Sequence, residues 1–407
     1  MGFWYLWGGL CGILLIAGIL DKQIHQYFLG QIPTRVNVNG TRGKSTVTRL
    51  ITGSLREAGN KVVGKTTGTA ARMIFWDEKE EMQVVRKGNL PNIHEQCKVI
   101  RLAAQRGAEY LVSECMAVRP EYQLVFARQL LKNNIGVIVN TLPDHLDVMG
   151  PTTREVAKAL SATIPYNGLL IIIEDEFTPF YKQVADKRHC EVRVADPSKI
   201  PQAYLDQFPY FLFPENVALA LEVALALGIE REVALQGMLK ARPDPGVLTI
   251  TPLRLGKKEF MFANAFAAND PVSTMVIYQR LAEKGYQDYP LVVLANCRAD
   301  RVDRTKQMAN EVLPNLSCSH LIAIGSATRH IKQNYEKKLY HCDNLWDLED
   351  VPADTVLKKL EELPENSLIF GIGNIHGTAE ELLKSFYEQD QQTELWIEWR
   401  EQKLVHI

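Results

Sequence analysis

The segment Val36-Asn37-Val38-Asn39-Gly40-Thr41-Arg42-Gly43-Lys44-Ser45-Thr46 decides the fold of this 407-residue chain. A short apolar run leads into a glycine turn, and the apolar residues after it recur at helical spacing, namely Val47, Leu50, Ile51 and Leu55. Strand, glycine loop and helix in this order predict a phosphate-binding loop, because glycines let backbone N–H groups approach phosphate oxygens and a helix N-terminus attracts negative charge. The alternative is a glycine-rich turn that binds no nucleotide.

This loop predicts a site for ATP and a divalent metal, Mg²⁺ or Mn²⁺. Lys44 would reach the outer phosphates, and the Ser45 hydroxyl would bind the metal. The common P-loop pattern has its first glycine five positions before Gly43, where this chain has Val38, so the loop is a shortened form. The residues expected to bind the nucleotide are Gly40, Thr41, Arg42, Gly43, Lys44, Ser45 and Thr46.

Composition limits the class of protein. The chain is 46% hydrophobic, which is enough for two or three packed domains. A net charge of −2 gives no reason to expect a nucleic-acid partner. The seven cysteines form no CxxC pair, a pattern that suits reduced thiols in the cytosol.

The N-terminal segment is distinct from the rest. Residues 3–20 carry no charge, and eighteen apolar residues nearly cross a bilayer core of about 30 Å. We therefore predict a transmembrane anchor helix over 1–22, a single-pass location in the cytoplasmic membrane, and catalytic domains in the cytoplasm. The alternative is an apolar helix that is buried or lies on the protein surface.

Beyond this segment, short apolar strands alternate with helical patterns, which predicts an α/β fold with mainly parallel sheets. A helix cannot continue through residues 241–246, which include two prolines. We expect an ATP-binding central domain over 23–247, a smaller Rossmann-like α/β domain over 248–390 and a tail over 391–407 that either docks on a partner or packs back.

Two polar groups follow predicted strands of the central domain. Glu114 ends the strand expected over 110–113, and a carboxylate at a carboxyl edge can hold Mg²⁺. His145 lies between Asp144 and Asp147 after the strand expected over 136–140, where three metal-competent side chains share one loop. We predict metal roles for Ser45, Glu114 and His145. The alternatives are a solvated carboxylate and a structural histidine.

The second domain has polar loops after three predicted strands, beginning at Asn264, Asn296 and Gly371. The loop after Asn296 carries Arg298 and Arg301, whose guanidinium groups suit phosphates and carboxylates. We predict that Arg298 binds the nucleotide and that Arg301 acts in catalysis. A solvated salt-bridge network is the alternative.

These elements together resemble the Mur ligase superfamily, over most of the chain after the N-terminal segment. The G-T-x-G-K-S-T loop, Glu114, the N-x-x-x-D-H-L-D segment from Asn140 and the helix that bears Asn216 resemble the nucleotide and metal residues of that family. The resemblance implies that Asn216 approaches the nucleotide and that His145 serves a second metal. One departure is Ala268, which stands where the family's Y-A-H-N-P loop has histidine.

A narrower resemblance is to the ligase subunits of poly-γ-glutamate synthases, carried by the strings SECMAVRPEYQ, NTLPDHLDVMGPT, FAANDPVST, NCRADRVDRT and GIGNIHG. It implies an ATP-dependent amide ligase that polymerises glutamate through an acyl phosphate, with Lys44, Glu114, His145 and Arg301 as catalytic residues. It also implies capsule polymer synthesis, glutamate and the growing chain as substrates, other membrane subunits as partners, and a homo-oligomer. The alternatives are a folylpolyglutamate- or cyanophycin-type ligase for another acceptor, a P-loop ATPase that is not a ligase, and a scaffold that binds nucleotide without turnover.

Overall fold

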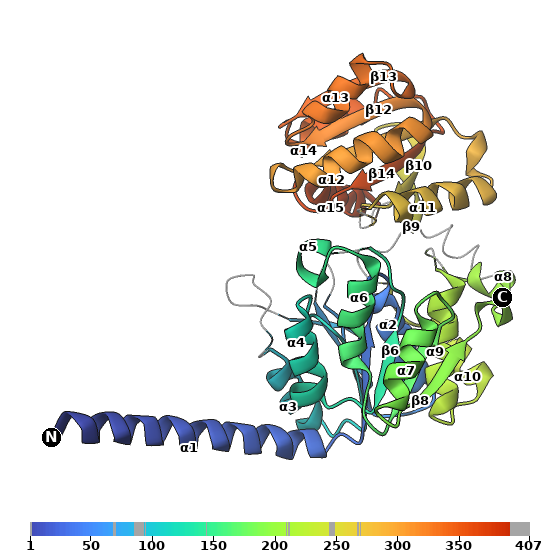
Figure 1. Ribbon diagram of the computed structural model, residues 1–407. Coiled ribbons are helices and arrows are strands. Elements are labelled where there is room, and N and C mark those ends of the chain that lie inside the picture. Colours follow the sequence, from blue (N-terminus) through green and yellow to red (C-terminus); the bar gives the residue numbers. More distant parts are fainter. Residues whose placement is uncertain are drawn as a thin grey trace. The chain divides into compact units, whose positions relative to one another are not determined.

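The computed structural model describes residues 2–67, 71–84, 93, 95–143, 145–208, 210, 212–243, 249–266, 268 and 270–390. Two compact units result, Met1–Asp206 with Leu212–Asp244 and Gln207–Phe211 with Pro245–Ile407. Each unit contains its own β-sheet with helices packed on it (Figure 1). The domain limits predicted at residues 22, 247 and 390 stay predictions. Asp144, residues 244–246 and the tail lie outside the described residues.

Within the described residues, the first unit has a sheet with the strand order β4-β3-β2-β5-β1-β6-β7-β8. The strands from β2 to β8 in this order pair in parallel, and β3 and β4 add an antiparallel edge. The strands are β1 Thr34–Asn39, β2 Val62–Lys65, β3 Arg72–Phe75, β4 Met82–Gln83, β5 Tyr110–Glu114, β6 Ile135–Ile138, β7 Leu169–Ile173 and β8 Glu191–Ala195.

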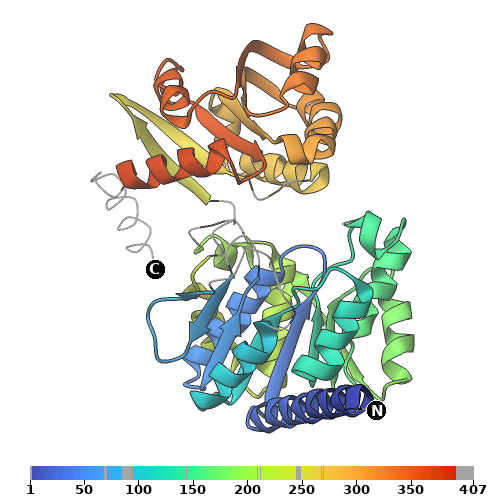
Figure 2. The same ribbon diagram turned by 90° about the vertical axis from the view of Figure 1, so that its left-hand side faces the viewer.

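Helices cover both faces of this sheet (Figures 1 and 2). Buried side chains of α3, α6 and α7 pack on one face, and α2 packs with α9 and α10 on the other. The α-helices are α1 Gly2–Gly30, α2 Lys44–Glu57, α3 Glu95–Gln105, α4 Pro120–Val125, α5 Leu146–Met149, α6 Thr153–Leu160, α7 Thr178–Asp186, α8 Gln202–Leu205, α9 Pro214–Ala226 and α10 Arg231–Leu239. A π-helical turn, Phe126–Leu131, continues α4.

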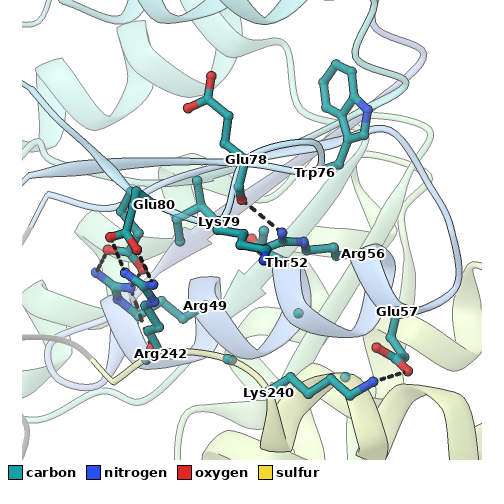
Figure 3. Close-up of a pocket in the computed structure, with 15 residues that line it drawn as sticks. Arg49, Thr52, Arg56, Glu57, Trp76, Glu78, Lys79, Glu80, Lys240 and Arg242 are labelled. Atoms are coloured by element: carbon teal, nitrogen blue, oxygen red, sulfur yellow. Dashed lines mark hydrogen bonds and ion pairs between the residues drawn. The ribbon is translucent and has the colours of Figure 1, made fainter.

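The chain between β3 and β4 is joined to the helices beside it by ion pairs. Glu81 pairs with Arg49 of α2, and Glu80 pairs with Arg242, which follows α10 (Figure 3). These contacts fix the antiparallel edge of the sheet to the helix that follows the glycine loop.

The second unit has a sheet with the order β13-β12-β11-β14-β10-β9, in which β9 alone of these pairs antiparallel. Its strands are β9 Thr249–Leu255, β10 Lys258–Asn264, β11 Leu291–Cys297, β12 Ser317–Gly325, β13 His341–Glu349 and β14 Leu368–Gly373. The α-helices are α11 Pro271–Glu283, α12 Val302–Gln307, α13 Arg329–Glu336, α14 Ala353–Leu360 and α15 Thr378–Asp390.

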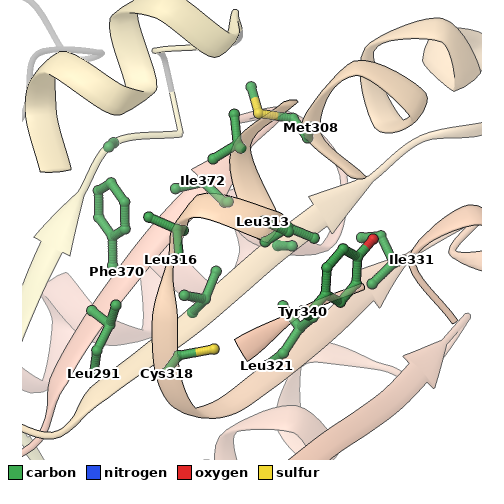
Figure 4. Close-up of a cluster of buried hydrophobic side chains, with 14 of the residues drawn as sticks. Leu291, Met308, Leu313, Leu316, Cys318, Leu321, Ile331, Tyr340, Phe370 and Ile372 are labelled. Atoms are coloured by element: carbon green, nitrogen blue, oxygen red, sulfur yellow. The ribbon is translucent and has the colours of Figure 1, made fainter. Parts of the chain in front are cut away.

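Successive side chains of a strand point to opposite faces of the sheet. The apolar residues of these strands therefore form a separate hydrophobic core on each face of the second sheet. Leu321 and Phe370 pack with Leu313 and Ile331 on one face (Figure 4). Ile322 and Ile369 belong to the core on the other face, together with residues of α14 and α15. The predicted α/β character of both regions is therefore confirmed.

The predicted membrane anchor is wrong. In the part of the chain that the structure describes, no helix combines the length and the apolar character that crossing a bilayer requires. The helix that contains residues 3–20 runs on to Gly30 through Asp21, Lys22 and other polar residues. Its last turns pack on the first unit, where Leu29 is buried. The transmembrane helix and the single-pass membrane location are both corrected by this finding.

Candidate functional site

The glycine loop connects β1 to α2, as predicted. Gly40 and Gly43 have φ values of 137° and 80°, which side-chain-bearing residues rarely adopt. A Cβ atom on Gly40 would also lie 3.0 Å from the backbone nitrogen of Val139. The loop can therefore pass close to its neighbours, and the first N–H groups of α2 remain at the helix end where an anion would bind.

Lys44 is the first residue of α2, and its side chain folds back over the loop. The ammonium Nζ donates hydrogen bonds to the carbonyl oxygens of Gly40 at 2.9 Å and Thr41 at 3.1 Å. A positive charge is thus held directly at the loop that could receive phosphates.

Ser45 and Glu114 are brought together by the sheet. Strand β5 lies parallel to β1 with Glu114 opposite Val38, so the carboxylate reaches the start of α2. The Ser45 hydroxyl donates to Glu114 Oε2 at 2.8 Å, and the backbone N–H of Thr67 donates to the same oxygen at 2.6 Å. Glu114 is buried. A hydroxyl and a carboxylate in contact beside a phosphate loop are the oxygen ligands that Mg²⁺ and Mn²⁺ take, so these residues fit a nucleotide-bound metal.

Asn140 fixes the loop from the neighbouring strand, a function for which sequence analysis gave no separate expectation. Its Oδ1 accepts from the Thr41 hydroxyl at 2.6 Å and from the Arg42 N–H at 3.0 Å, and its Nδ2 donates to the Arg42 carbonyl at 3.1 Å. A polar residue directly after an apolar strand was the available signal. Its partner could be known only once β6 was placed beside β1.

Asn216 reaches the same loop from α9. A Cβ atom on Gly43 would lie 3.0 Å from Asn216 Oδ1 and 3.3 Å from its Nδ2, so the amide lies directly against this glycine. The structure therefore brings together the glycine loop, Glu114, Asn140 and Asn216. The roles of these residues in binding and catalysis stay predictions.

His145 lies on a separate turn after β6. It is exposed, has a left-handed φ of 49°, and precedes the short helix α5. Among the described residues, which exclude Asp144, no three His, Cys, Asp or Glu side chains gather in a way that could hold a metal. The proposed metal role of His145 thus rests on its place in the loop alone.

Arg298 and Arg301 belong to the second unit, in the loop between β11 and α12. Strands β10, β14 and β11 are parallel neighbours, so the three polar loops predicted there leave the same edge of that sheet. Arg298 Nη2 donates to Asp300 Oδ2 at 2.8 Å, and Arg301 is exposed. Asn296 Nδ2 donates to the His376 carbonyl at 2.9 Å and joins two of the loops.

Cys115 follows Glu114, and burial raises the pKa of its thiol to about 12, as it does for Cys297. Because the thiolate is the reactive form, this burial makes both thiols unreactive near neutral pH. We expect iodoacetamide to modify exposed Cys11 first and to leave Cys115 and Cys297 intact in the folded protein. Peptide mass spectrometry before and after guanidinium unfolding measures this, and rapid native labelling of Cys115 would contradict the burial.

Comparisons with known proteins identify the family and the fold of the chain. The Mur ligase middle domain matches residues 38–207, and the poly-gamma-glutamate synthase CapB C-terminal domain matches residues 250–389. Among solved structures, MurF from Acinetobacter baumannii aligns with a TM-score of 0.64 at 15% identity, covering 91% of this chain and 80% of that chain. A bifunctional folylpolyglutamate synthase/dihydrofolate synthase from Yersinia pestis, complexed with AMPPNP and Mn ion, aligns with a TM-score of 0.66 at 12% identity, covering 90% and 92%. Both alignments show that this chain has the same fold as these proteins.

Two curated proteins are much more similar in sequence. PGA synthase CapB of Bacillus subtilis (strain 168) is 52% identical over 378 residues, which cover 93% of this chain and 96% of that protein. Capsule biosynthesis protein CapB of Bacillus anthracis is 48% identical over 382 residues, covering 94% and 82%. Because the likeness extends over more than nine tenths of this chain and includes both units, this chain belongs to the CapB family of Mur-ligase-related proteins.

Proposed function

We propose that this chain is an ATP-dependent amide ligase that joins glutamate into poly-γ-glutamate. One observation carries the proposal: the Ser45–Glu114 contact beside a glycine loop that Asn140 fixes in place and Asn216 lies against. The identity of about half of all residues with CapB of Bacillus subtilis supports the choice of glutamate over the acceptors of other Mur-type ligases.

The reaction has two transfers. A carboxylate oxygen of one glutamate attacks the γ-phosphorus of ATP, the bond to the bridging oxygen breaks, and ADP leaves. The amine nitrogen of a second glutamate then loses a proton and attacks the acyl carbon of the acyl phosphate. The bond from that carbon to the phosphate oxygen breaks, and an amide and inorganic phosphate result.

The residues of the first unit have distinct tasks in this proposal. The loop N–H groups and Lys44 bind the phosphates and stabilise the charge that develops during transfer. Ser45 and Glu114 hold Mg²⁺ or Mn²⁺, which when bound neutralises phosphate charge. Asn140 keeps the loop in shape, and Asn216 positions the nucleotide against Gly43.

We further propose that His145 serves a second metal and that Arg298 and Arg301 bind anionic oxygens of the nucleotide or the substrate. Planar guanidinium groups suit both phosphate and carboxylate. The chain would work as one subunit of a polymer synthase that includes membrane subunits, and as a homo-oligomer.

Trapping the acyl phosphate with hydroxylamine tests the reaction. With ATP, Mg²⁺, glutamate and hydroxylamine, we expect glutamyl hydroxamate and ADP to form together, and both to require glutamate. ADP release that does not depend on glutamate, without hydroxamate, would instead identify an ATPase that is not a ligase. Nucleotide binding without ADP release would favour the scaffold alternative. Hydroxamate formed with another amino acid and not with glutamate would overturn the choice of substrate.

A further inference from the structure

A cavity of about 520 Å³ lies on the first unit between α2, the segment that joins β3 to β4, and α10 (Figure 3). It is large enough for a small ligand. None of the residues placed in the nucleotide site lines it. Its walls carry five basic side chains, namely Arg49, Arg56, Lys79, Lys240 and Arg242, and four acidic ones, namely Glu57, Glu78, Glu80 and Glu81.

Three of the basic side chains already hold carboxylates of the chain itself, and one of them is Lys240, which donates to Glu57 at 2.6 Å. Arg242 donates to both oxygens of Glu80, at 2.7 and 2.8 Å, and Arg49 contacts both oxygens of the next residue, Glu81. Two successive carboxylates of the segment between β3 and β4 thus occupy two guanidinium groups. Paired N–H groups of this kind are the geometry in which arginine recognises carboxylate.

The two ion pairs differ in how firmly they are held. The Arg49 and Glu81 side chains are 2% and 14% exposed, whereas Arg242 and Glu80 are 50% and 82% exposed. Exposed ion pairs contribute little to stability, because water and salt screen them. Another carboxylate could therefore replace Glu80 on Arg242 at little cost.

The cavity extends along the helix that begins at the glycine loop. Helix α2 begins directly after the glycine loop, which follows the carboxyl end of β1. Arg49 therefore lies nearer the carboxyl edge of the sheet than Arg56 does. At 1.5 Å per residue, Arg49 and Arg56 are about 8 and 18 Å along the α2 axis from Lys44. A long anionic chain could contact this helix over much of its length.

We propose that this cavity binds a polycarboxylate, namely the poly-γ-glutamate chain, and that Glu80 holds the place of a polymer carboxylate on Arg242 when no polymer is bound. The identity of the polymer rests on the proposed function. The binding itself requires only the cations and carboxylates described above.

Fluorescence anisotropy with a dye-labelled γ-linked glutamate decamer, without ATP, tests this proposal. We expect the double variant Lys240→Gln/Arg242→Gln to bind the decamer at least tenfold more weakly than the unchanged protein. We expect Glu80→Gln to bind it several-fold more tightly, because the chain's own competitor for Arg242 is removed. Arg193→Gln and Glu191→Gln are matched controls, since they break another exposed arginine–glutamate pair of the same unit, and both should bind as the unchanged protein does.

The opposite changes in decamer affinity that we expect for the two variants distinguish a binding site from ion pairs that only stabilise the structure. If the ion pairs only fasten the β3–β4 segment, Glu80→Gln would leave decamer affinity unchanged or lower it, and the proposal would be overturned. Affinity that is unchanged in the double variant, or no binding by the unchanged protein, would overturn it as well. Thermal melts check that each variant is folded. Glutamate-dependent hydroxamate formation tests the ligase function separately. Failure of the polymer-binding proposal can therefore be distinguished from failure of the proposed function.

Discussion

Lys44→Ala is expected to lower ATP-dependent amide formation at least about a hundredfold while the chain keeps its fold. The ammonium lies over the loop, bonded to the carbonyls of Gly40 and Thr41, where we propose that phosphate charge develops. Removing one preorganised donor to such charge costs about 2.7–4 kcal/mol of transition-state stabilisation. The hydrogen bonds lost in the folded protein contribute about 1–3 kcal/mol, so unfolding should not follow.

Release of ADP in the presence of glutamate measures the rate, and a thermal melt measures the fold. Lys61→Ala is the matched control, because it removes the same charge from an exposed lysine of the same unit. We expect this control to work at nearly the unchanged rate. A Lys44→Ala protein that forms product at a similar rate would show that the loop is not the phosphate site.

The strand–loop–helix unit could be predicted from sequence because all of its determinants are local. The helix predicted from the spacing of Val47, Leu50, Ile51 and Leu55 is α2, Lys44–Glu57, and the strand predicted before the glycine turn is β1, Thr34–Asn39. Two glycines in unusual conformations and an apolar stripe at helical spacing need no distant partner to be recognised. The same holds for the apolar helix that carries Asn216.

Other features depend on contacts between distant segments and could not be predicted in this way. Asn140 fixes the glycine loop about 100 residues away, through a pairing of β6 with β1 that no local pattern specifies. The short strands β3 and β4 form an edge that is held by ion pairs to α2 and to Arg242. The cavity beside them therefore had no counterpart in the sequence analysis.

The N-terminal helix was predicted wrongly because its local sequence pattern suggested a structure that its distant contacts contradict. The uncharged run over 3–20 indicated a membrane anchor, yet the helix continues to Gly30 and its end belongs to the first unit. His25 Nε2 lies 2.8 Å from the Leu130 carbonyl, and the Arg101 guanidinium lies 5.4 Å from the Phe28 ring centroid. Hydropathy alone could not reveal this tertiary packing.

Glu114→Gln is expected to lower amide formation at least about a hundredfold and to weaken Mn²⁺ binding in the presence of an ATP analogue. The substitution keeps the shape of the side chain but removes the negative charge that a divalent cation requires of its ligand. The Ser45 hydroxyl and the Thr67 N–H would still have an oxygen acceptor, the amide oxygen of the glutamine. Both hydrogen bonds would weaken, because a hydrogen bond to a charged acceptor, worth about 1.5–3 kcal/mol, becomes one to a neutral acceptor. A neutral amide costs less to bury than a carboxylate, which offsets part of this loss and should preserve the fold.

Electron paramagnetic resonance of Mn²⁺ with the non-hydrolysable analogue measures metal binding, and hydroxamate formation measures the reaction. Glu109→Gln is the matched control, since this exposed carboxylate immediately precedes the same strand, β5, at its other end. The proposed metal site on the nucleotide loop rests on the contact of Ser45 with Glu114, so the two measurements should fall together. If Glu114→Gln loses activity but binds Mn²⁺ as before, the carboxylate acts in another way, and the metal must be assigned to other oxygen ligands of the first unit.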